Sequence, residues 1–335
     1  MDFEYGYEGT SAKDLIKLFD IRKKDTIVYD NSDFYGTTST PLDLPTSKYV
    51  KDVQTIKMTE PKCLIETEPQ LFRTNGRLLS KLEELDLLLN IDFIEIYDHL
   101  YIDENLCIYK VPYFDYEIAN SNWLEAQEKN AYFYFVHNGI KYEDFIASMS
   151  KRSLQIFNSS LNILTYENCI PNYLSSFGTP PFSYPMYGER EISDQLSRVL
   201  SFRNISFYVN KSLKCTRVND HYEINGIYGN ATFRKRKSEA NEVVSPVSFY
   251  FRVLLLKQPF ILPTFFGTIM VDKKIVNVIS INCSAKVCPP NTFLVYFYAD
   301  HKLPAHLMSH LKIDENNILN DVTFSNMREF NWSFS

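Results

Sequence analysis

The fold is decided by the N-terminal stretch DFEYGYEGTSAKDLIKLFDIRKKDTIVYD, which runs from Asp2 to Asp30. Its residue pattern predicts an opening strand, a helix over residues 13–19 with its apolar side chains on one face, and a second strand over residues 26–29. Asp30 ends the second strand 21 positions after Gly9, which is the spacing of the ribose-binding acid in dinucleotide-binding βαβ units. We therefore predict an α/β (α+β) fold that begins with a Rossmann-like unit.

The turn inside this unit lacks the chemistry of a working dinucleotide site. Such a turn needs glycines because the backbone must approach the pyrophosphate closely at the start of the first helix. This chain has Gly6 and Gly9 but no third glycine, and Glu8 brings a negative charge between them. We interpret Gly6, Gly9 and Asp30 as a vestigial cofactor loop and expect no bound flavin or nicotinamide.

The composition describes a folded chain with an acidic balance. Its 335 residues are 45% apolar and 23% charged, with a formal net charge of −6, enough material for a large domain and a small one. The acidic balance argues against nucleic acid as a partner. The first residues lack the apolar core of a signal peptide, so we expect a cytoplasmic protein whose six cysteines are free thiols.

No motif for catalysis or metal binding stands out. The chain has no Gly-x-Ser-x-Gly elbow and no Walker loop, and its cysteines are scattered. His306 and His310 lie one helical turn apart but lack the glutamate of a zinc-binding helix. We expect neither an enzyme nor a metal site.

A change of periodicity divides the rest of the chain. Leucines at positions 78, 82, 85 and 89 predict a helix that buries one face, and strand patterns follow up to Val111. From Tyr116 to Phe177 the pattern is helical, and the proline-rich residues 179–185 end it. We place the large domain at residues 1–112 and 181–335, and a small inserted helical domain at residues 113–180.

The second part of the large domain is predicted to continue the sheet. An amphipathic helix is expected over residues 191–202, and the run Arg234–Lys237 is expected in a solvated loop because acids flank it. A short helix at residues 305–311 is expected to precede a polar tail. Strand patterns occur at residues 205–209, 213–218, 221–228, 248–256, 269–271, 275–282 and 293–298.

Four segments resemble motifs of one family, in the family's order. They are VYDNSDFYG (28–36), EPQLFRTNGRL (68–78), IYKVP (108–112) and FGTPPFSYPMYG (177–188). These segments are similar to motifs of the Rab GDP dissociation inhibitor and Rab escort protein superfamily. The chain resembles a divergent, shortened member that is closer to the GDP dissociation inhibitors.

The resemblance implies both a fold and a function. The implied fold is an FAD/NAD(P)-binding, Rossmann-like large domain of the flavin-monooxygenase type without cofactor, plus a small inserted helical domain. The implied function is to bind prenylated, GDP-bound Rab GTPases, slow GDP release, and carry the GTPases between membranes in vesicle transport. Such a protein would be a monomer that contacts membranes transiently. Two alternatives are a Rab escort protein, which presents Rab to geranylgeranyl transferase, and a flavin-dependent oxidoreductase.

The resemblance also assigns site residues. The Rab-binding platform falls on Tyr35, Glu191, Arg198 and the pair Phe207 and Tyr208. The helical domain would bind the prenyl group, although each of its apolar residues is more often part of an ordinary core than of a lipid pocket, because a small helical domain needs such residues to fold. The prenyl-binding candidates are Trp123, Phe145, Ile146, Met149, Ile156, Phe157 and Leu161.

Overall fold

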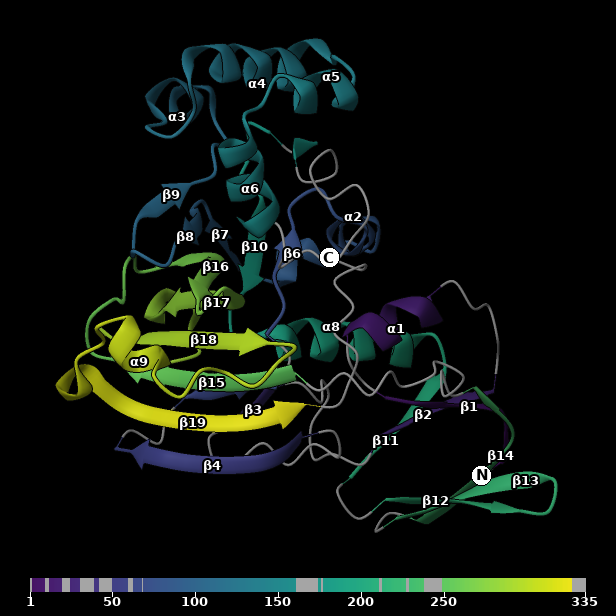
Figure 1. The fold of residues 1–335 in the computed structure, drawn as a ribbon. Coiled ribbons are helices and arrows are strands. Elements are labelled where there is room, and N and C mark those ends of the chain that lie inside the picture. Colours follow the sequence, from purple (N-terminus) through teal and green to yellow (C-terminus); the bar gives the residue numbers. More distant parts are fainter. Residues whose placement is uncertain are drawn as a thin grey trace.

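The computed structural model describes residues 2–9, 12–19, 25–30, 39–41, 50–59, 63–67, 69–160, 174–175, 177–210, 213–226, 229–237 and 249–326. Within this part of the chain, helices pack against a six-stranded sheet and an eight-stranded sheet (Figure 1). Tyr35 and Leu161, two of the predicted site residues, lie outside the described residues.

The six-stranded sheet contains the predicted βαβ unit. Four parallel strands stand in the order β11, β2, β1, β14, and the antiparallel strands β13 and β12 extend the sheet beyond β14. The strands predicted from the sequence in this region are confirmed. The elements are β1 (Asp2–Glu8), α1 (Ala12–Leu18), β2 (Thr26–Asp30), β11 (Ile205–Val209), β12 (Lys214–Val218), β13 (His221–Gly226) and β14 (Gly229–Lys237).

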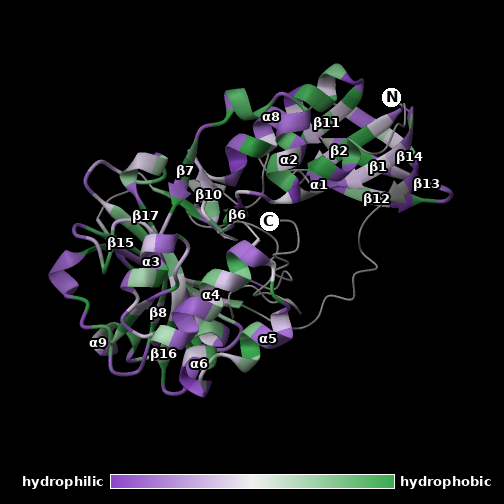
Figure 2. Cartoon of the chain, turned by 90° about the horizontal axis from the view of Figure 1, so that it is seen from above, coloured by the Kyte–Doolittle hydropathy of each residue, from purple (hydrophilic) through white to green (hydrophobic). Residues whose placement is uncertain are grey.

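Helices α1, α2 (Arg77–Glu84) and α8 (Glu189–Phe202) share one apolar core with this sheet. Leu15 of α1, Leu82 of α2, Leu196 of α8 and Val28 of β2 are fully buried there. Helix α8 is amphipathic, as its sequence predicts, because apolar residues recur on the side that faces α1. Seen from above, this unit lies beside the eight-stranded sheet and its helices (Figure 2).

The eight-stranded sheet has the order β4, β19, β15, β18, β17, β16, β8, β9. Neighbouring strands are antiparallel except β16 and β8, which are parallel. Its strands are β4 (Val50–Met58), β8 (His99–Ile102), β9 (Ile108–Lys110), β15 (Phe249–Leu256), β16 (Phe265–Val271), β17 (Lys274–Asn282), β18 (Phe293–Ala299) and β19 (Ile318–Asn326).

Short strands and helices lie outside the two large sheets. Strand β10 pairs with both β6 and β7 and leads into the turn before α8, while β3 pairs with β5. These elements are β3 (Ser39–Pro41), β5 (Leu64–Glu66), β6 (Phe72–Arg73), β7 (Phe93–Ile96), β10 (Phe182–Pro185), α9 (Leu307–His310) and the short helices η1 (Leu88–Asn90), η3 (Cys283–Ala285) and η4 (Glu315–Asn317).

In the described part of the segment where the sequence predicts a helical domain, four helices follow β9. Helices α3 to α5 lie at the top of Figure 1, and α6 runs down to the eight-stranded sheet. The side chains of His99 and Thr268 bond to the carbonyl oxygens of Ser160 and Ser159, each at 2.9 Å, and join α6 to β8 and β16. The helices are α3 (Asp115–Asn120), α4 (Ala126–Asn138), α5 (Tyr142–Ala147) and α6 (Lys151–Ser160). We call them the helical insert.

The basic run Arg234–Lys237 corrects one prediction, since it belongs to strand β14 and not to a loop. Phe233 is buried under the sheet, and Lys235 extends toward Glu4 of β1, with Nζ and Oε1 3.1 Å apart. Ala231 and Phe233 are buried whereas Thr232 and Arg234 are more accessible, so the alternation of a strand is present here. The density of positive charge obscured it in the sequence.

The C-terminal region corrects a second prediction. The segment expected to be a polar tail forms β19, which lies between β4 and β15. Asp321 accepts two hydrogen bonds from the Arg252 guanidinium, at 2.6 and 3.0 Å, while Val322 and Phe324 are buried. The strand appears polar in sequence because it buries polar side chains that are paired within the sheet.

One further expectation was wrong. Leu89 was predicted to share the buried face of the helix after Gly76, but its side chain is 91% exposed. Helix α2 ends at Glu84, so the helical period does not continue as far as Leu89. Strand β4 was not predicted.

Candidate functional site

The turn from β1 to α1 is the place where a dinucleotide would bind in a fold of this kind. Its two glycines have packing roles of their own. A Cβ at Gly6 would lie 2.5 Å from the ring of Phe233, and a Cβ at Gly9 would lie 2.6 Å from a carboxylate oxygen of Asp14. Gly9 also has a φ of +112°, which side chains disfavour. Contacts within the chain therefore account for both glycines of the predicted cofactor loop.

A carboxylate of the chain already occupies the start of α1. The backbone N–H of Ala12 donates a hydrogen bond to Oε1 of Glu189 at 3.0 Å, across 177 positions of sequence. The backbone N–H of Glu189 donates in turn to Oε1 of Glu66 at 2.7 Å. Both glutamates are only 1% exposed. Nothing in the sequence predicts this pair, because neither glutamate belongs to a motif.

The described residues do not fit a dinucleotide pyrophosphate at this turn. A phosphate would have to replace Glu189 at Ala12 and would lie near the carboxylate of Asp14. Two unit charges of the same sign repel by about 4 kcal/mol at 4 Å and an effective dielectric constant of about 20. Asp30 is buried at the end of β2, and its carbonyl accepts a hydrogen bond from Asn210 N–H at 3.1 Å.

The outward face of α8 carries two residues of the predicted Rab-binding platform. Arg198 is exposed and Glu191 is partly exposed, and they lie on the same side of the helix, seven positions apart. Oε1 of Glu191 accepts a hydrogen bond from Gln195 Nε2 at 3.0 Å. Burial raises the pKa of Asp194; the Arg190 guanidinium opposes this rise, Glu191 adds to it, and Arg198 opposes it. The face is therefore a row of interacting charges.

Exposed aromatic residues stand at both ends of α8. Phe202, in its last turn, is 83% exposed, and Tyr187, just before its start, is 51% exposed. Tyr187 has a φ of 64°, in the left-handed region that bulky residues rarely adopt. Glu191, Gln195, Arg198 and Phe202 follow one another at helical spacing; we call these four residues the α8 stripe. Sequence reasoning missed Phe202, although its position four residues after Arg198 was a usable signal.

The predicted pair Phe207 and Tyr208 lies on β11, the edge strand of the six-stranded sheet. Phe207 packs against the core that contains α1 and α8, whereas Tyr208 packs against the core on the opposite side of the sheet. Successive side chains of a strand point to opposite faces. Only Phe207 therefore lies on the face that carries α8.

The predicted prenyl-binding residues that the structure describes pack against one another in the helical insert. The rings of Trp123 and Phe157 meet edge to face, with centroids 5.3 Å apart, and Phe145 stacks on Phe135 at 4.5 Å. Trp123 Nε1 donates a hydrogen bond to the Lys110 carbonyl oxygen at 3.0 Å. Ile146, Met149 and Ile156 belong to or pack against the same cluster. A lipid chain would have to displace contacts among these side chains.

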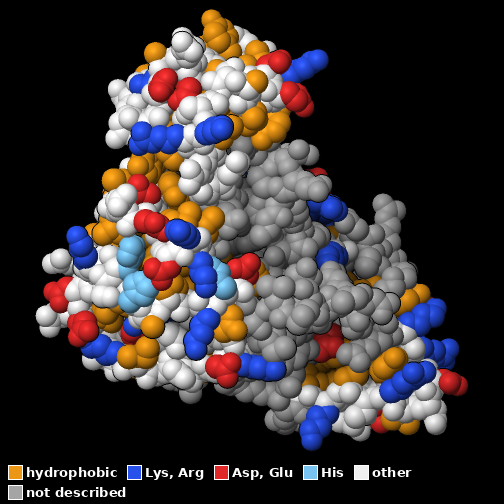
Figure 3. All heavy atoms as spheres, in the orientation of Figure 1, with side chains coloured by type: hydrophobic (Ala, Val, Ile, Leu, Met, Phe, Trp, Pro, Cys, Tyr) orange, Lys and Arg blue, Asp and Glu red, His pale blue; other side chains and the backbone are white. Residues whose placement is uncertain are grey.

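The surface of the helical insert is also rich in apolar groups. Tyr116, Phe133 and Tyr134 are exposed, and hydrophobic side chains alternate with charged ones over the top of the molecule in Figure 3.

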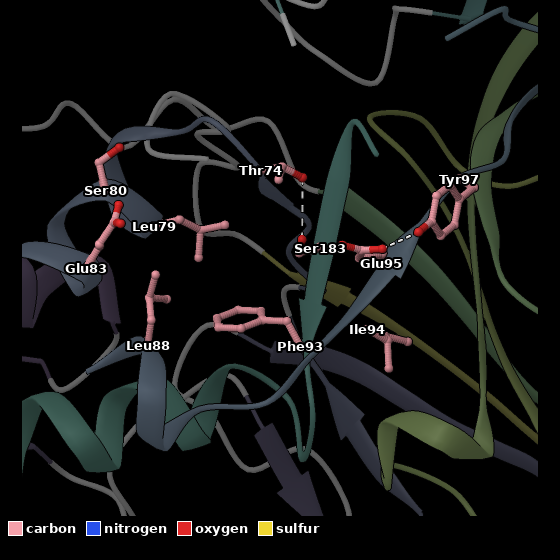
Figure 4. A pocket seen from close by; sticks show the side chains of 10 residues that line it. All are labelled: Thr74, Leu79, Ser80, Glu83, Leu88, Phe93, Ile94, Glu95, Tyr97 and Ser183. Carbon is pink, nitrogen blue, oxygen red and sulfur yellow. Dashed lines mark hydrogen bonds between the residues drawn. The ribbon is translucent and has the colours of Figure 1, made fainter. Parts of the chain in front are cut away.

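An open pocket of about 590 Å³ lies between α2, η1, β7 and β10 (Figure 4). Four apolar side chains line it together with the carboxylates of Glu83 and Glu95, and the Tyr97 hydroxyl donates a hydrogen bond to Glu95. This lining suits an apolar or cationic group. The apolar residues are Leu79, Leu88, Phe93 and Ile94.

Two buried groups are held in their uncharged forms. Burial lowers the pKa of His99 to about 3, although its hydrogen bond to Ser160 acts in the opposite direction. Burial also raises the pKa of the Cys288 thiol to about 11, so both groups are neutral at pH 7. Among the residues that the structure describes, no cluster of His, Cys, Asp or Glu could hold a metal ion. No helix in the described ranges is both long and apolar enough to cross a bilayer.

Comparison with known proteins identifies the fold. No family model and no curated protein matches the sequence. The structure of a Rab GDI from Plasmodium falciparum superposes with a TM-score of 0.71 at 17% identity, covering 97% of this chain and 89% of that one. An oxidoreductase from Methanosarcina mazei gives 0.58 at 12% identity, covering 98% and 89%. Putrescine oxidase bound to putrescine gives 0.51 at 10% identity, covering 93% and 81%.

The chain therefore has a mixed α/β, FAD/NAD(P)-binding Rossmann-like fold, as found in Rab GDI and in flavin oxidoreductases. At these identities the likeness concerns the fold, and function has to be argued from the site.

Proposed function

We propose that the chain is a carrier of the Rab GDP dissociation inhibitor type, which binds prenylated, GDP-bound Rab GTPases and catalyses no reaction itself. The observation that carries this proposal is the contact at the start of α1, where the Ala12 N–H donates a hydrogen bond to the Glu189 carboxylate at 3.0 Å, in a chain whose fold is similar to that of a Rab GDI over 97% of its length. A flavin oxidoreductase needs the N–H groups at the start of this helix for its cofactor, whereas a protein-binding scaffold does not.

The α8 stripe is the proposed docking face for Rab. Aromatic and arginine side chains supply much of the energy of protein interfaces, and the stripe offers both in Phe202 and Arg198. Charges at an interface fix the orientation of the partner more than they add affinity, which is the role we give to Glu191. Tyr35 is assigned to this face by the sequence resemblance alone.

The helical insert is the proposed lipid-binding part. Each buried CH₂ group of a prenyl chain contributes about 0.8 kcal/mol, so a geranylgeranyl group needs an apolar environment to leave the membrane. Trp123, Phe145 and Phe157 provide one, provided that the lipid replaces part of their mutual packing. The exposed Tyr116, Phe133 and Tyr134 suit brief contact with a membrane surface, since tyrosine combines an apolar ring with a polar tip.

The proposal is tested by membrane extraction. Geranylgeranylated Rab from the source organism is bound to liposomes, loaded with GDP or a non-hydrolysable GTP analogue, and mixed with the purified chain. We expect the GDP form to leave the liposomes in a complex with the chain and the GTP form to stay. Absence of extraction in both nucleotide states would contradict the proposal.

The same preparation separates the alternatives. Transfer of lipid to unprenylated Rab when geranylgeranyl transferase is added would favour an escort protein. Stoichiometric flavin absorbance in the purified chain would favour an oxidoreductase.

A further inference from the structure

Glu189 connects helix α8 to the start of α1, where related folds bind their cofactor. We propose that its carboxylate takes the place of a dinucleotide pyrophosphate at the start of α1 and thereby holds α8 against α1 without a cofactor. The consequence for Rab docking rests on the proposed function, but the substitution of a side chain for a cofactor does not.

The position and the chemistry of Glu189 both support this role. In Rossmann-like folds the pyrophosphate accepts hydrogen bonds from the backbone at the N-terminus of the first helix. Here Ala12 is the first residue of α1, and its N–H donates to Glu189 Oε1 at 3.0 Å. A carboxylate and a phosphate are both anions that only accept hydrogen bonds, so one can replace the other at the same donor.

The backbone of Glu189 is itself held by a hydrogen bond. Its backbone N–H donates to Glu66 Oε1 at 2.7 Å, and the N–H of Glu66 donates to the Tyr296 hydroxyl at 3.0 Å. Tyr296 belongs to β18 and Glu66 to β5. Hydrogen bonds therefore link the eight-stranded sheet, through α8, to the first helix of the six-stranded sheet.

This link gives α8 a defined direction. The apolar contacts of Ile192 and Leu196 with α1 favour close packing but do not fix rotation or sliding of the helix, since the hydrophobic effect is not directional. A hydrogen bond to a charged group does have a preferred geometry. Glu189 is buried in the first turn of α8, so fixing it also fixes where Glu191 and Arg198 point on the outer side.

The same contact excludes a dinucleotide. To bind at Ala12, a phosphate would have to expel a buried carboxylate, and at the other end of the turn the carboxylate of Asp14 lies against Gly9. The chain thus keeps the fold of the related oxidoreductases, and the Glu189 carboxylate supplies the anion at the start of α1.

Titration of the purified full chain with FAD and with ADP, followed by calorimetry, tests the exclusion. We expect no saturable binding of either probe to the wild-type chain. Stoichiometric binding of FAD or ADP would overturn the inference.

Amide hydrogen exchange tests the contact itself in three variants. In Glu189→Ala we expect the Ala12 amide to exchange at least about threefold faster, because it loses its acceptor. Glu189→Gln keeps a carbonyl oxygen as acceptor, so we expect an intermediate rate from a variant that folds readily. Glu191→Gln, on the outer side of the same helix, is the matched control, and its Ala12 amide should exchange at the wild-type rate.

An Ala12 exchange rate that is the same in the wild type, Glu189→Ala and Glu189→Gln would overturn the inference, and so would an equal acceleration in Glu191→Gln. Neither experiment uses Rab. A chain that behaves as expected here but fails to extract Rab would contradict the proposed function alone.

Discussion

The helical insert and the α8 stripe both contain aromatic residues, but they place them in opposite surroundings. Phe157 of the insert is fully buried between Trp123 and Tyr132. Phe202 of the stripe is almost fully exposed beside Arg198. A buried apolar side chain stabilises the fold. An exposed one has an unfavourable hydration free energy and is available to bind a partner.

Because of this difference, substitutions in the two regions should have different effects. Substitutions in the insert should lower the free energy of unfolding and affect lipid binding through it. Substitutions in the stripe should lower the affinity for Rab and leave the free energy of unfolding nearly unchanged.

The largest effect is expected for Phe157→Ala. Removing this ring leaves a cavity among Trp123, Tyr132 and Phe145, and such substitutions cost about 3–5 kcal/mol of stability. Urea unfolding followed by circular dichroism measures the change. Tyr134→Ala, exposed on α4 of the same insert, is the control and should stay within about 0.5 kcal/mol of the wild type. Equal stability of Phe157→Ala and wild type would mean that the insert is open rather than packed.

A smaller effect with a defined pH dependence is expected for Glu128→Gln. Burial opposes ionisation of Glu128, but hydrogen bonds from the N–H groups of Glu125 and Ser150 and from the hydroxyls of Ser150 and Ser153 outweigh it and lower its pKa below the usual 4.5. The carboxylate therefore stabilises the fold above pH 4.5, and this contribution is lost as the pH falls through the lowered pKa.

Glutamine cannot accept all of these hydrogen bonds, so Glu128→Gln should cost about 1–3 kcal/mol at pH 7. The difference from wild type should shrink in acid, as measured by urea unfolding at pH 7 and at several values below 4.5. Glu143→Gln, an exposed change on α5, serves as the control. A difference that grows in acid would refute the assignment.

On the α8 stripe, Arg198→Ala should weaken the association with GDP-bound, prenylated Rab by about 1–3 kcal/mol. Its thermal stability should remain that of the wild type, because the side chain is exposed. Fluorescence titration gives the affinity, and calorimetry gives the stability. Arg217 is exposed on β12 of the six-stranded sheet, so Arg217→Ala should leave both the affinity for Rab and the thermal stability unchanged. If the two variants bind Rab alike, the stripe is not the docking face.

The smallest effect is expected for Glu191→Gln. A partly exposed charge contributes less than about 1 kcal/mol to affinity, and its main effect is on the rate of association. Stopped-flow measurements should show slower association with Rab at low salt and a weaker salt dependence than in the wild type. An unchanged salt dependence would remove Glu191 from the docking face.

The elements with a regular period were the ones that the sequence predicted well. The β1–α1–β2 unit and α8 follow from alternating or helical spacing of apolar residues such as Leu15, Ile192 and Leu196. Strands β14 and β19 were missed for different reasons. Exposed positive charges obscure the alternation of β14, whereas β19 buries polar side chains that are paired within the sheet. The bond between Arg252 and Asp321 is an example.

The candidate site was predictable only in part. The resemblance assigned Glu191 and Arg198, and the helical period placed them on one face. The contact of Ala12 with Glu189 joins positions 177 apart and has no local pattern, so only the folded chain reveals it. The packing of Phe145 and Phe157 is likewise a property of the tertiary structure, since apolar residues at helical spacing fit a core and a lipid site equally well.

We propose that this chain recognises a prenylated Rab GTPase in its GDP state. This proposal is tested most directly by equilibrium binding of the wild-type chain to the same geranylgeranylated Rab in two nucleotide states, followed by fluorescence in detergent-free buffer. We predict that the GDP-bound form binds at least about tenfold more tightly than the form bound to a GTP analogue, a difference of about 1.4 kcal/mol. Equal affinity for the two forms, or no binding of either, would contradict the claim.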